Sequence, residues 1–66
     1  MNVTVNGEPR DVGADLNISG LIQMLGLKPE LTAVQVNGEI LERTSLSEYV
    51  LSEGDVVELI RVVGGG

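Results

Sequence analysis

The sequence contains no cysteine and no histidine. The chain therefore cannot form disulfides, thiolate nucleophiles, zinc sites built from Cys and His, or imidazole acid–base pairs. Aromatic residues are nearly absent too, since Tyr49 is the only one. The 66 residues are enough for one small domain. We expect this domain to be stabilised by packed aliphatic side chains, which supply most of its 42% hydrophobic content.

Basic residues are few. Four Lys and Arg stand against ten Asp and Glu, which gives a formal charge of −6. The four are scattered along the chain, at Arg10, Lys28, Arg43 and Arg61. Binding to a phosphate backbone requires clustered cations, so we expect neither nucleic acid nor an anionic membrane surface as a partner. The acidity favours solubility and steering towards a basic protein surface.

Long hydrophobic runs are also missing. No apolar run approaches the roughly 18 residues of a membrane span. Residues 1–7 have neither the basic start nor the apolar stretch of a signal peptide. We therefore expect a cytoplasmic protein that is a monomer when free.

Apolar and polar side chains alternate over residues 1–5, which predicts a strand with one buried face. Asn6-Gly7 follows, and this pair is a strong hairpin signal because both residues tolerate positive φ. The return strand should cover residues 8–12. Pro9 places it at an edge of the sheet, because proline cannot donate to a ladder.

The period then changes to that of a helix. The apolar stripe at i, i+3, i+4 and i+7 consists of Ile18, Leu21, Ile22 and Leu25. Asn17 is a favourable N-cap, and Gly26 is placed to end the helix in a left-handed conformation. Gly20 weakens the helix by about 1 kcal/mol relative to alanine, and it lets a neighbour approach closely.

Alternation resumes at residues 33–36. The pair Asn37-Gly38 then predicts a second hairpin with the same turn chemistry as the first, returning through residues 39–41. Residues 44–51 have no clean period. Three of them are spaced to suit one helical turn that pins a loop: Leu46, Tyr49 and Val50.

Residues 52–55 read as a turn, and the last strand should run from Val56 to about Val63. The order is therefore strand, strand, helix, strand, strand, irregular segment, strand. One helix covers only one face of a sheet. We predict an α+β fold of the β-grasp, or ubiquitin-like, type: a mixed sheet of about five strands with the two terminal strands adjacent in the middle. The domain should span residues 1–63.

The chain offers little for catalysis. Only carboxylates, Lys28 and hydroxyls remain as candidate groups. Carboxylate pairs occur at Glu39 with Glu42 and at Glu53 with Asp55. The second pair lies in the predicted turn, where Asp and Gly have conformational reasons to occur. We therefore expect no self-contained enzyme and no metal site.

The three final glycines are the exception. A frayed end explains them in part, but a chain without side chains can also extend through a narrow channel into another protein. The terminal carbonyl then stays open to nucleophiles. We identify the Gly66 carboxylate as the candidate reactive group, on a flexible tail of residues 64–66 in which Gly64 and Gly65 pass through the partner's channel.

The last strand offers a candidate docking surface. If Val57 and Leu59 face the helix, Ile60 and Val62 face outward. Exposed aliphatic patches rimmed by charge often mark docking sites, although single exposed aliphatic residues are common on any surface. We take Ile60, Val62 and Val63 as the candidate docking residues.

Several segments together resemble a known family. They are Val5-Asn6-Gly7-Glu8, Val36-Asn37-Gly38-Glu39-Ile40, Arg43, Glu53-Gly54-Asp55-Val56-Val57-Glu58 and Val63-Gly64-Gly65-Gly66. Each is weak alone. In this order and over this length they resemble the ubiquitin-like sulfur carriers of the ThiS/MoaD family, with the thiamine-biosynthesis branch preferred.

This resemblance implies a carrier rather than a catalyst. A ThiF-like adenylating enzyme would use ATP and Mg²⁺ to convert the Gly66 carboxylate to an acyl-adenylate. A donor such as a cysteine desulfurase would then supply sulfur to give a thiocarboxylate. A ThiG-like thiazole synthase would accept that sulfur for the thiazole ring of thiamine. No cofactor is implied on the chain itself.

Three alternatives remain open from the sequence. The small subunit of molybdopterin synthase has the same fold and diglycine end but tends to be longer. A protein modifier would use the same adenylate to form isopeptide bonds. A non-covalent binding domain would use Ile60 and Val62 and leave the glycines without a role.

Overall fold

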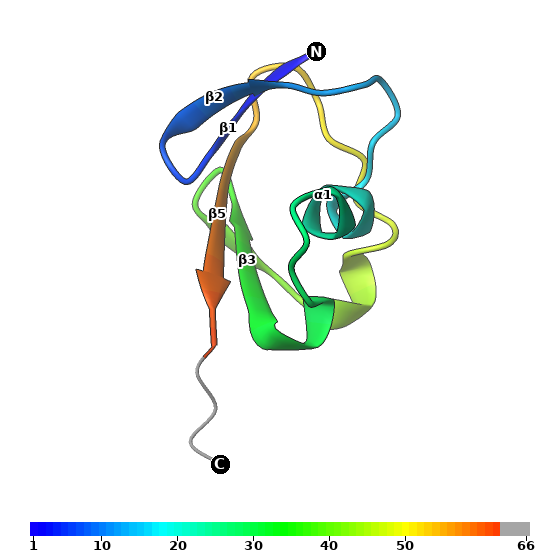
Figure 1. Ribbon diagram of the computed structural model, residues 1–66, viewed down its shortest axis with the longest axis vertical. Coiled ribbons are helices and arrows are strands. Elements are labelled where there is room, and N and C mark those ends of the chain that lie inside the picture. The colour runs from blue at the N-terminus through cyan, green and yellow to red at the C-terminus, as the bar shows by residue number, and fades with distance from the viewer. Residues whose placement is uncertain (63–66) are drawn as a thin grey trace.

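The computed structural model describes residues 1–62, and Figure 1 shows one α-helix packed on one side of a twisted sheet. The described strands form a five-stranded sheet in the order β2-β1-β5-β3-β4. The elements are β1 (Asn2–Val5), β2 (Glu8–Asp11), α1 (Ile18–Met24), η1 (Pro29–Leu31), β3 (Thr32–Val36), β4 (Glu39–Leu41), η2 (Arg43–Ser45) and β5 (Val56–Arg61). Val63 and the glycines lie outside the described residues.

The sheet is mixed, as predicted. β1 runs antiparallel to β2 and parallel to β5, while β3 runs antiparallel to both β4 and β5. The first and last strands are therefore neighbours at the centre of the sheet. Pro9 pairs with Thr4 on the edge strand β2, where its missing N–H breaks no ladder.

Both Asn-Gly turns form as predicted. Asn6 and Gly7 have φ values of 50° and 81°, and Asn37 and Gly38 have 52° and 85°. Positive φ at both central residues is typical of the type I′ turn, whose twist matches that of the flanking strands. The two hairpins are thus set by local sequence.

Helix α1 also begins and ends where the sequence predicts. The Gly20 N–H donates to Oδ1 of Asn17 at 2.7 Å, and Gly26 has a φ of 73° just after the helix. A Cβ added at Gly20 would lie 2.8 Å from Cδ1 of Leu16, which identifies the close neighbour. A seven-residue helix is marginal alone, so α1 depends on the sheet. Among residues 1–62, no helix has the length and hydropathy to cross a bilayer.

The core lies between α1 and the sheet. It consists of Val3, Val5, Val12, Ile18, Leu21, Ile22, Val34, Val36, Leu46, Leu51, Val57 and Leu59. All are aliphatic, as the composition required. The half-buried ring of Tyr49 packs against the edge of this cluster.

The irregular segment differs from the sequence expectation at one residue. Leu46 is buried and Tyr49 is half-buried, but the side chain of Val50 is 51% exposed and Leu51 is buried instead. The reason is that the helical turn ends before this point. Val50 forms a bridge with Asn17, and the Leu51 N–H donates to the Leu16 carbonyl at 2.9 Å. The chain is therefore extended here, and neighbouring side chains point to opposite sides.

Two isoleucines provide a matched test of this core. Ile22 is fully buried, whereas Ile40 is 74% exposed. We expect Ile22→Ala to lower the free energy of unfolding by about 2–5 kcal/mol because it leaves a cavity. Ile40→Ala should change it by less than about 0.5 kcal/mol. Urea unfolding of both variants measures the difference, and equal losses would contradict the assignment of the core.

Candidate functional site

Strand β5 has one buried and one exposed face. Val57 and Leu59 are buried, while Ile60 and Val62 are each 50% exposed. The predicted orientation of the strand is therefore correct. In Figure 1, β5 runs from the centre of the sheet to the C-terminal end of the described chain. Val63, the third predicted docking residue, and Gly64, Gly65 and Gly66 lie outside the described residues.

The exposed face extends beyond β5. Gln35 on β3 lies opposite both Glu58 and Ile40, so these three side chains share one face. Ile60 lies on the same face, two residues after Glu58. We define the open face as the exposed aliphatic side chains Ile40, Val56, Ile60 and Val62 around the polar pair Gln35 and Glu58.

The sequence did not identify Ile40 as part of this face. Strand β4 has only three residues, and a strand this short has no clear period of its own. The pairing register of β4 with β3 could have placed Ile40 on this face. Counting back from the Asn37-Gly38 turn pairs Gln35 with Ile40, and Gln35 lies between two core valines that face the helix.

Both hairpin asparagines bind the backbone of β5. Oδ1 of Asn37 accepts from the Val56 N–H at 2.9 Å, and the Asn37 N–H donates to the Val56 carbonyl at 2.8 Å. Oδ1 of Asn6 accepts from the Leu59 N–H at 2.7 Å. Strand β1 pairs with β5 only as far as Val57. The Asn6 side chain therefore replaces a ladder bond that β1 is too short to make.

Asp55, at the start of β5, is the most buried ionisable residue of the described chain, with 7% of its surface exposed. Its carboxylate accepts from Asn37 Nδ2 at 3.0 Å, from the Tyr49 hydroxyl at 3.1 Å and from the Ser52 N–H at 2.9 Å. Burial alone would raise the pKa of Asp55, but these hydrogen bonds stabilise the charged form and lower its pKa. Burial and the bond to Asp55 raise the pKa of Tyr49.

Hydrogen bonds give a structural explanation for one of the two carboxylate pairs noted in the sequence, Glu53 with Asp55. Oε1 of Glu53 accepts from the Asn2 N–H at 3.0 Å, and Asp55 organises the turn. In residues 1–62 no three acidic side chains cluster as metal ligands. The described contacts hold β5 in place and leave one of its faces exposed.

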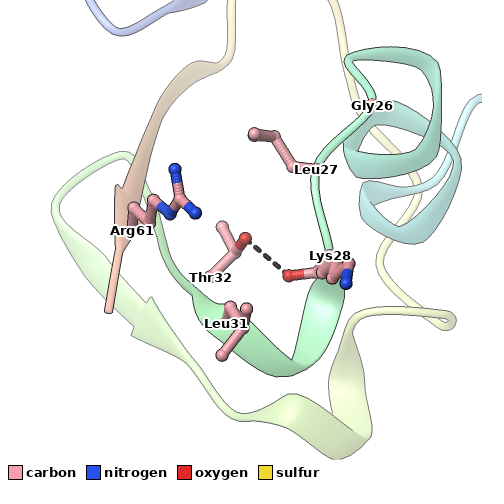
Figure 2. A pocket seen from close by; sticks show the side chains of 6 residues that line it. All are labelled: Gly26, Leu27, Lys28, Leu31, Thr32 and Arg61. Carbon is pink, nitrogen blue, oxygen red and sulfur yellow. Dashed lines mark hydrogen bonds between the residues drawn. The ribbon is translucent and has the colours of Figure 1, made fainter. Parts of the chain in front are cut away.

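A second feature lies beside the end of β5. A hollow of about 170 Å³ is lined by Gly26, Leu27, Lys28, Leu31, Thr32 and Arg61. Figure 2 shows the Arg61 guanidinium pointing across it towards Leu27 and Thr32. Sequence patterns gave no reason to bring Lys28 and Arg61 together.

Comparison with known proteins identifies the family. The sequence profile of the ThiS family matches residues 3–66. The chain belongs to the ThiS family. A crystal structure of the thiamine biosynthesis protein ThiS from Geobacter metallireducens superposes with a TM-score of 0.85 at 42% identity, with all of both chains covered. The resemblance to a ubiquitin-like ThiS sulfur carrier and the β-grasp prediction are both confirmed.

Two longer relatives contain a similar segment. A thiazole synthase of Magnetococcus marinus is 36% identical over 66 residues, and one of Paramagnetospirillum magneticum is 32% identical over 66 residues. Each match covers the whole of this chain but only 20% of the relative. This ThiS-family chain therefore spans about a fifth of the length of these proteins.

The Asp55 network predicts a specific acid dependence. A lowered pKa in the folded state contributes stability that is complete above the unfolded value, near 3.8, and is lost as the pH falls through the folded value. At pH ~7, Asp55→Asn should cost about 1–3 kcal/mol, because one acceptor oxygen is replaced by a donor. This difference should shrink between about pH 5 and pH 2.

Urea unfolding at several pH values measures this dependence. The control is Asp15→Asn, an exposed site, which should change the free energy of unfolding by less than about 0.5 kcal/mol at pH ~7. An Asp55→Asn deficit that stays constant down to pH ~2 would contradict the assigned role of the charge.

Proposed function

We propose that this chain carries sulfur to the thiazole ring in thiamine biosynthesis, through a thiocarboxylate on Gly66. The family match over residues 3–66 is the observation that supports this most strongly. Two further findings favour the thiamine branch. The similar crystal structure is that of a thiamine biosynthesis protein, and two relatives that contain a similar segment are named thiazole synthases.

The Gly66 carboxylate must be activated before sulfur can be added to it. A carboxylate is a poor electrophile because hydroxide leaves badly. An adenylating enzyme of the ThiF type would transfer AMP from ATP to Gly66 and release pyrophosphate, with Mg²⁺ neutralising the phosphate charge. The terminal sulfur of a persulfide, supplied by a donor such as a cysteine desulfurase, would then attack the carbonyl, and AMP would leave. A thiol of a partner protein would cleave the resulting acyl disulfide, which releases the Gly66 thiocarboxylate and leaves a disulfide on the partner. The thiocarboxylate would donate its sulfur in a ThiG-like thiazole synthase.

The chain's own contribution is delivery. The domain of residues 1–63 presents the end of β5, and the tail of residues 64–66 enters the partner. The catalytic groups, the ATP and the Mg²⁺ belong to the partners. The open face and the predicted docking residue Val63 would dock on the partner surface. We propose that the carrier works as a cytoplasmic monomer between its encounters.

Mass spectrometry tests the central step. The chain is incubated with its adenylating enzyme, ATP, Mg²⁺ and a sulfur donor, and its intact mass is measured. We expect a species in which one oxygen is replaced by sulfur. A variant lacking Gly65 and Gly66 should give no such species, yet unfold as the full chain does, because the described core ends at Leu59.

Two results would contradict the proposal. One is an unchanged mass with an adenylating enzyme that is shown to be active on another carrier. The other is full function of the variant without Gly65 and Gly66, which would favour a non-covalent binding domain. A ladder of conjugates that persists under denaturing, reducing conditions would instead point to a protein modifier.

The docking role of the open face is tested separately. Ile60→Asp places a charge in the centre of an aliphatic surface that becomes buried on docking. Affinity for the adenylating enzyme should fall at least tenfold, or by about 1.4 kcal/mol. Val50→Asp is the matched control, because Val50 is 51% exposed but belongs to the loop before β5 rather than to the open face. Equal losses for the two variants, measured by calorimetry, would rule out a specific docking face.

A further inference from the structure

The hollow beside β5 lies on the opposite side of the strand from the open face. Arg61 follows Ile60 directly, and successive side chains of a strand point to opposite faces. Arg61 is therefore the last residue of β5 on the side of the sheet that carries α1. The connection after α1 supplies the opposite wall, with Leu27 and Lys28, and Leu31 and Thr32 close the hollow between them.

This hollow, which we call the basic hollow, is lined by two basic residues. Lys28 and Arg61 are two of only four basic residues in a chain of net charge −6. Both are exposed, and within residues 1–62 neither forms an ion pair. Arg43 differs, because its guanidinium donates to the Glu30 carbonyl of the same chain at 2.9 Å.

A side-chain hydrogen bond fixes the segments that line the basic hollow. The Thr32 hydroxyl donates to the Lys28 carbonyl at 2.8 Å, which ties the start of β3 to the loop after α1. Leu27 and Leu31 are each 38% exposed and give the hollow apolar sides. A carboxylate on an aliphatic stem would match this arrangement, with its methylene groups on the leucines and its oxygens on the cations.

We propose that the basic hollow receives an acidic side chain, Asp or Glu, of the thiazole synthase. This inference rests on the proposed function and adds a second contact to it. The open face and the basic hollow lie on the two sides of the strand that leads to Gly66. A partner that encloses this strand end must cover both. A guanidinium and a carboxylate can pair through two parallel hydrogen bonds, which fixes orientation as well as distance.

A protein carboxylate fits better than a free phosphate or a nucleic acid. Lys28 and Arg61 are both exposed, so salt would screen their attraction for a free anion unless a partner covers them. Nucleic acid would be repelled by the remaining surface of a chain with ten acidic residues. Only a partner with its own positive surface around one acidic group would complement both the hollow and its acidic surroundings.

Binding of charge-reversed variants to the thiazole synthase of the same organism tests the inference. We expect Arg61→Glu and Lys28→Glu each to lower the affinity roughly tenfold, because the like charges repel. Arg10→Glu is the matched control, since it makes the same change of charge on the exposed strand β2 and should have an effect of less than about twofold. Arg61→Lys keeps the charge but loses the paired hydrogen bonds, so it should lose less affinity than Arg61→Glu without matching the wild type.

Salt gives a second readout. Raising the ionic strength from about 0.01 M to about 0.1 M shortens the screening length from ~30 Å to ~10 Å. Wild-type binding should weaken more than binding of Arg61→Glu. Thermal unfolding of each variant checks that the fold is retained, as expected for exposed residues.

The outcomes separate this inference from the proposed function. Unchanged affinity of both Lys28→Glu and Arg61→Glu, with normal wild-type binding, would overturn the acidic contact alone. An equal loss for Arg10→Glu would also overturn it, by showing that only net charge matters. If the wild-type chain forms a thiocarboxylate but does not bind the synthase, the thiazole branch of the proposed function fails, and this inference fails with it.

Discussion

The structure depends on how the central strand β5 is held. It has a neighbour on each side, and at both flanks an asparagine side chain completes what the ladder leaves open. Asn37 binds the first residue of β5, and Asn6 binds the Leu59 N–H beyond the last pairing with β1. A buried backbone N–H without a partner would cost about as much as a lost hydrogen bond. The same two residues that turn the hairpins therefore also fix the strand that leads to Gly66.

This arrangement lets one strand serve folding and recognition. Val57 and Leu59 complete the core under α1, while Ile60 and Val62 remain exposed on the open face. The exposed half of each of these two side chains adds little to the stability of the isolated chain, and exposed aliphatic patches often mark interaction sites. Within residues 1–62 the core ends at Leu59, and the described end of the strand beyond it is exposed.

Local patterns predicted much of the fold because several signals agreed. Asn-Gly turns, the Asn17 cap and the stripe over α1 each act within a few residues, where propensity and structure coincide. Such local patterns did not predict the contacts between residues that are far apart in the sequence. Asp55 looked like an ordinary turn residue, yet it is buried against Asn37 and Tyr49. The hollow between Lys28 and Arg61 arises only when the sheet brings the start of β3 beside the end of β5.

The absence of cysteine and histidine suits the proposed chemistry. An acyl-adenylate reacts with any nearby nucleophile, and a thiol on the carrier would compete for the Gly66 carbonyl by forming a thioester. The chain has no cysteine and no histidine, so no thiol or imidazole of its own can intercept the intermediate. Lys28 supplies the only side-chain amine. That amine and the hydroxyls are among the side-chain nucleophiles that remain. A carrier without thiol or imidazole groups thus leaves the choice of acceptor to its partners.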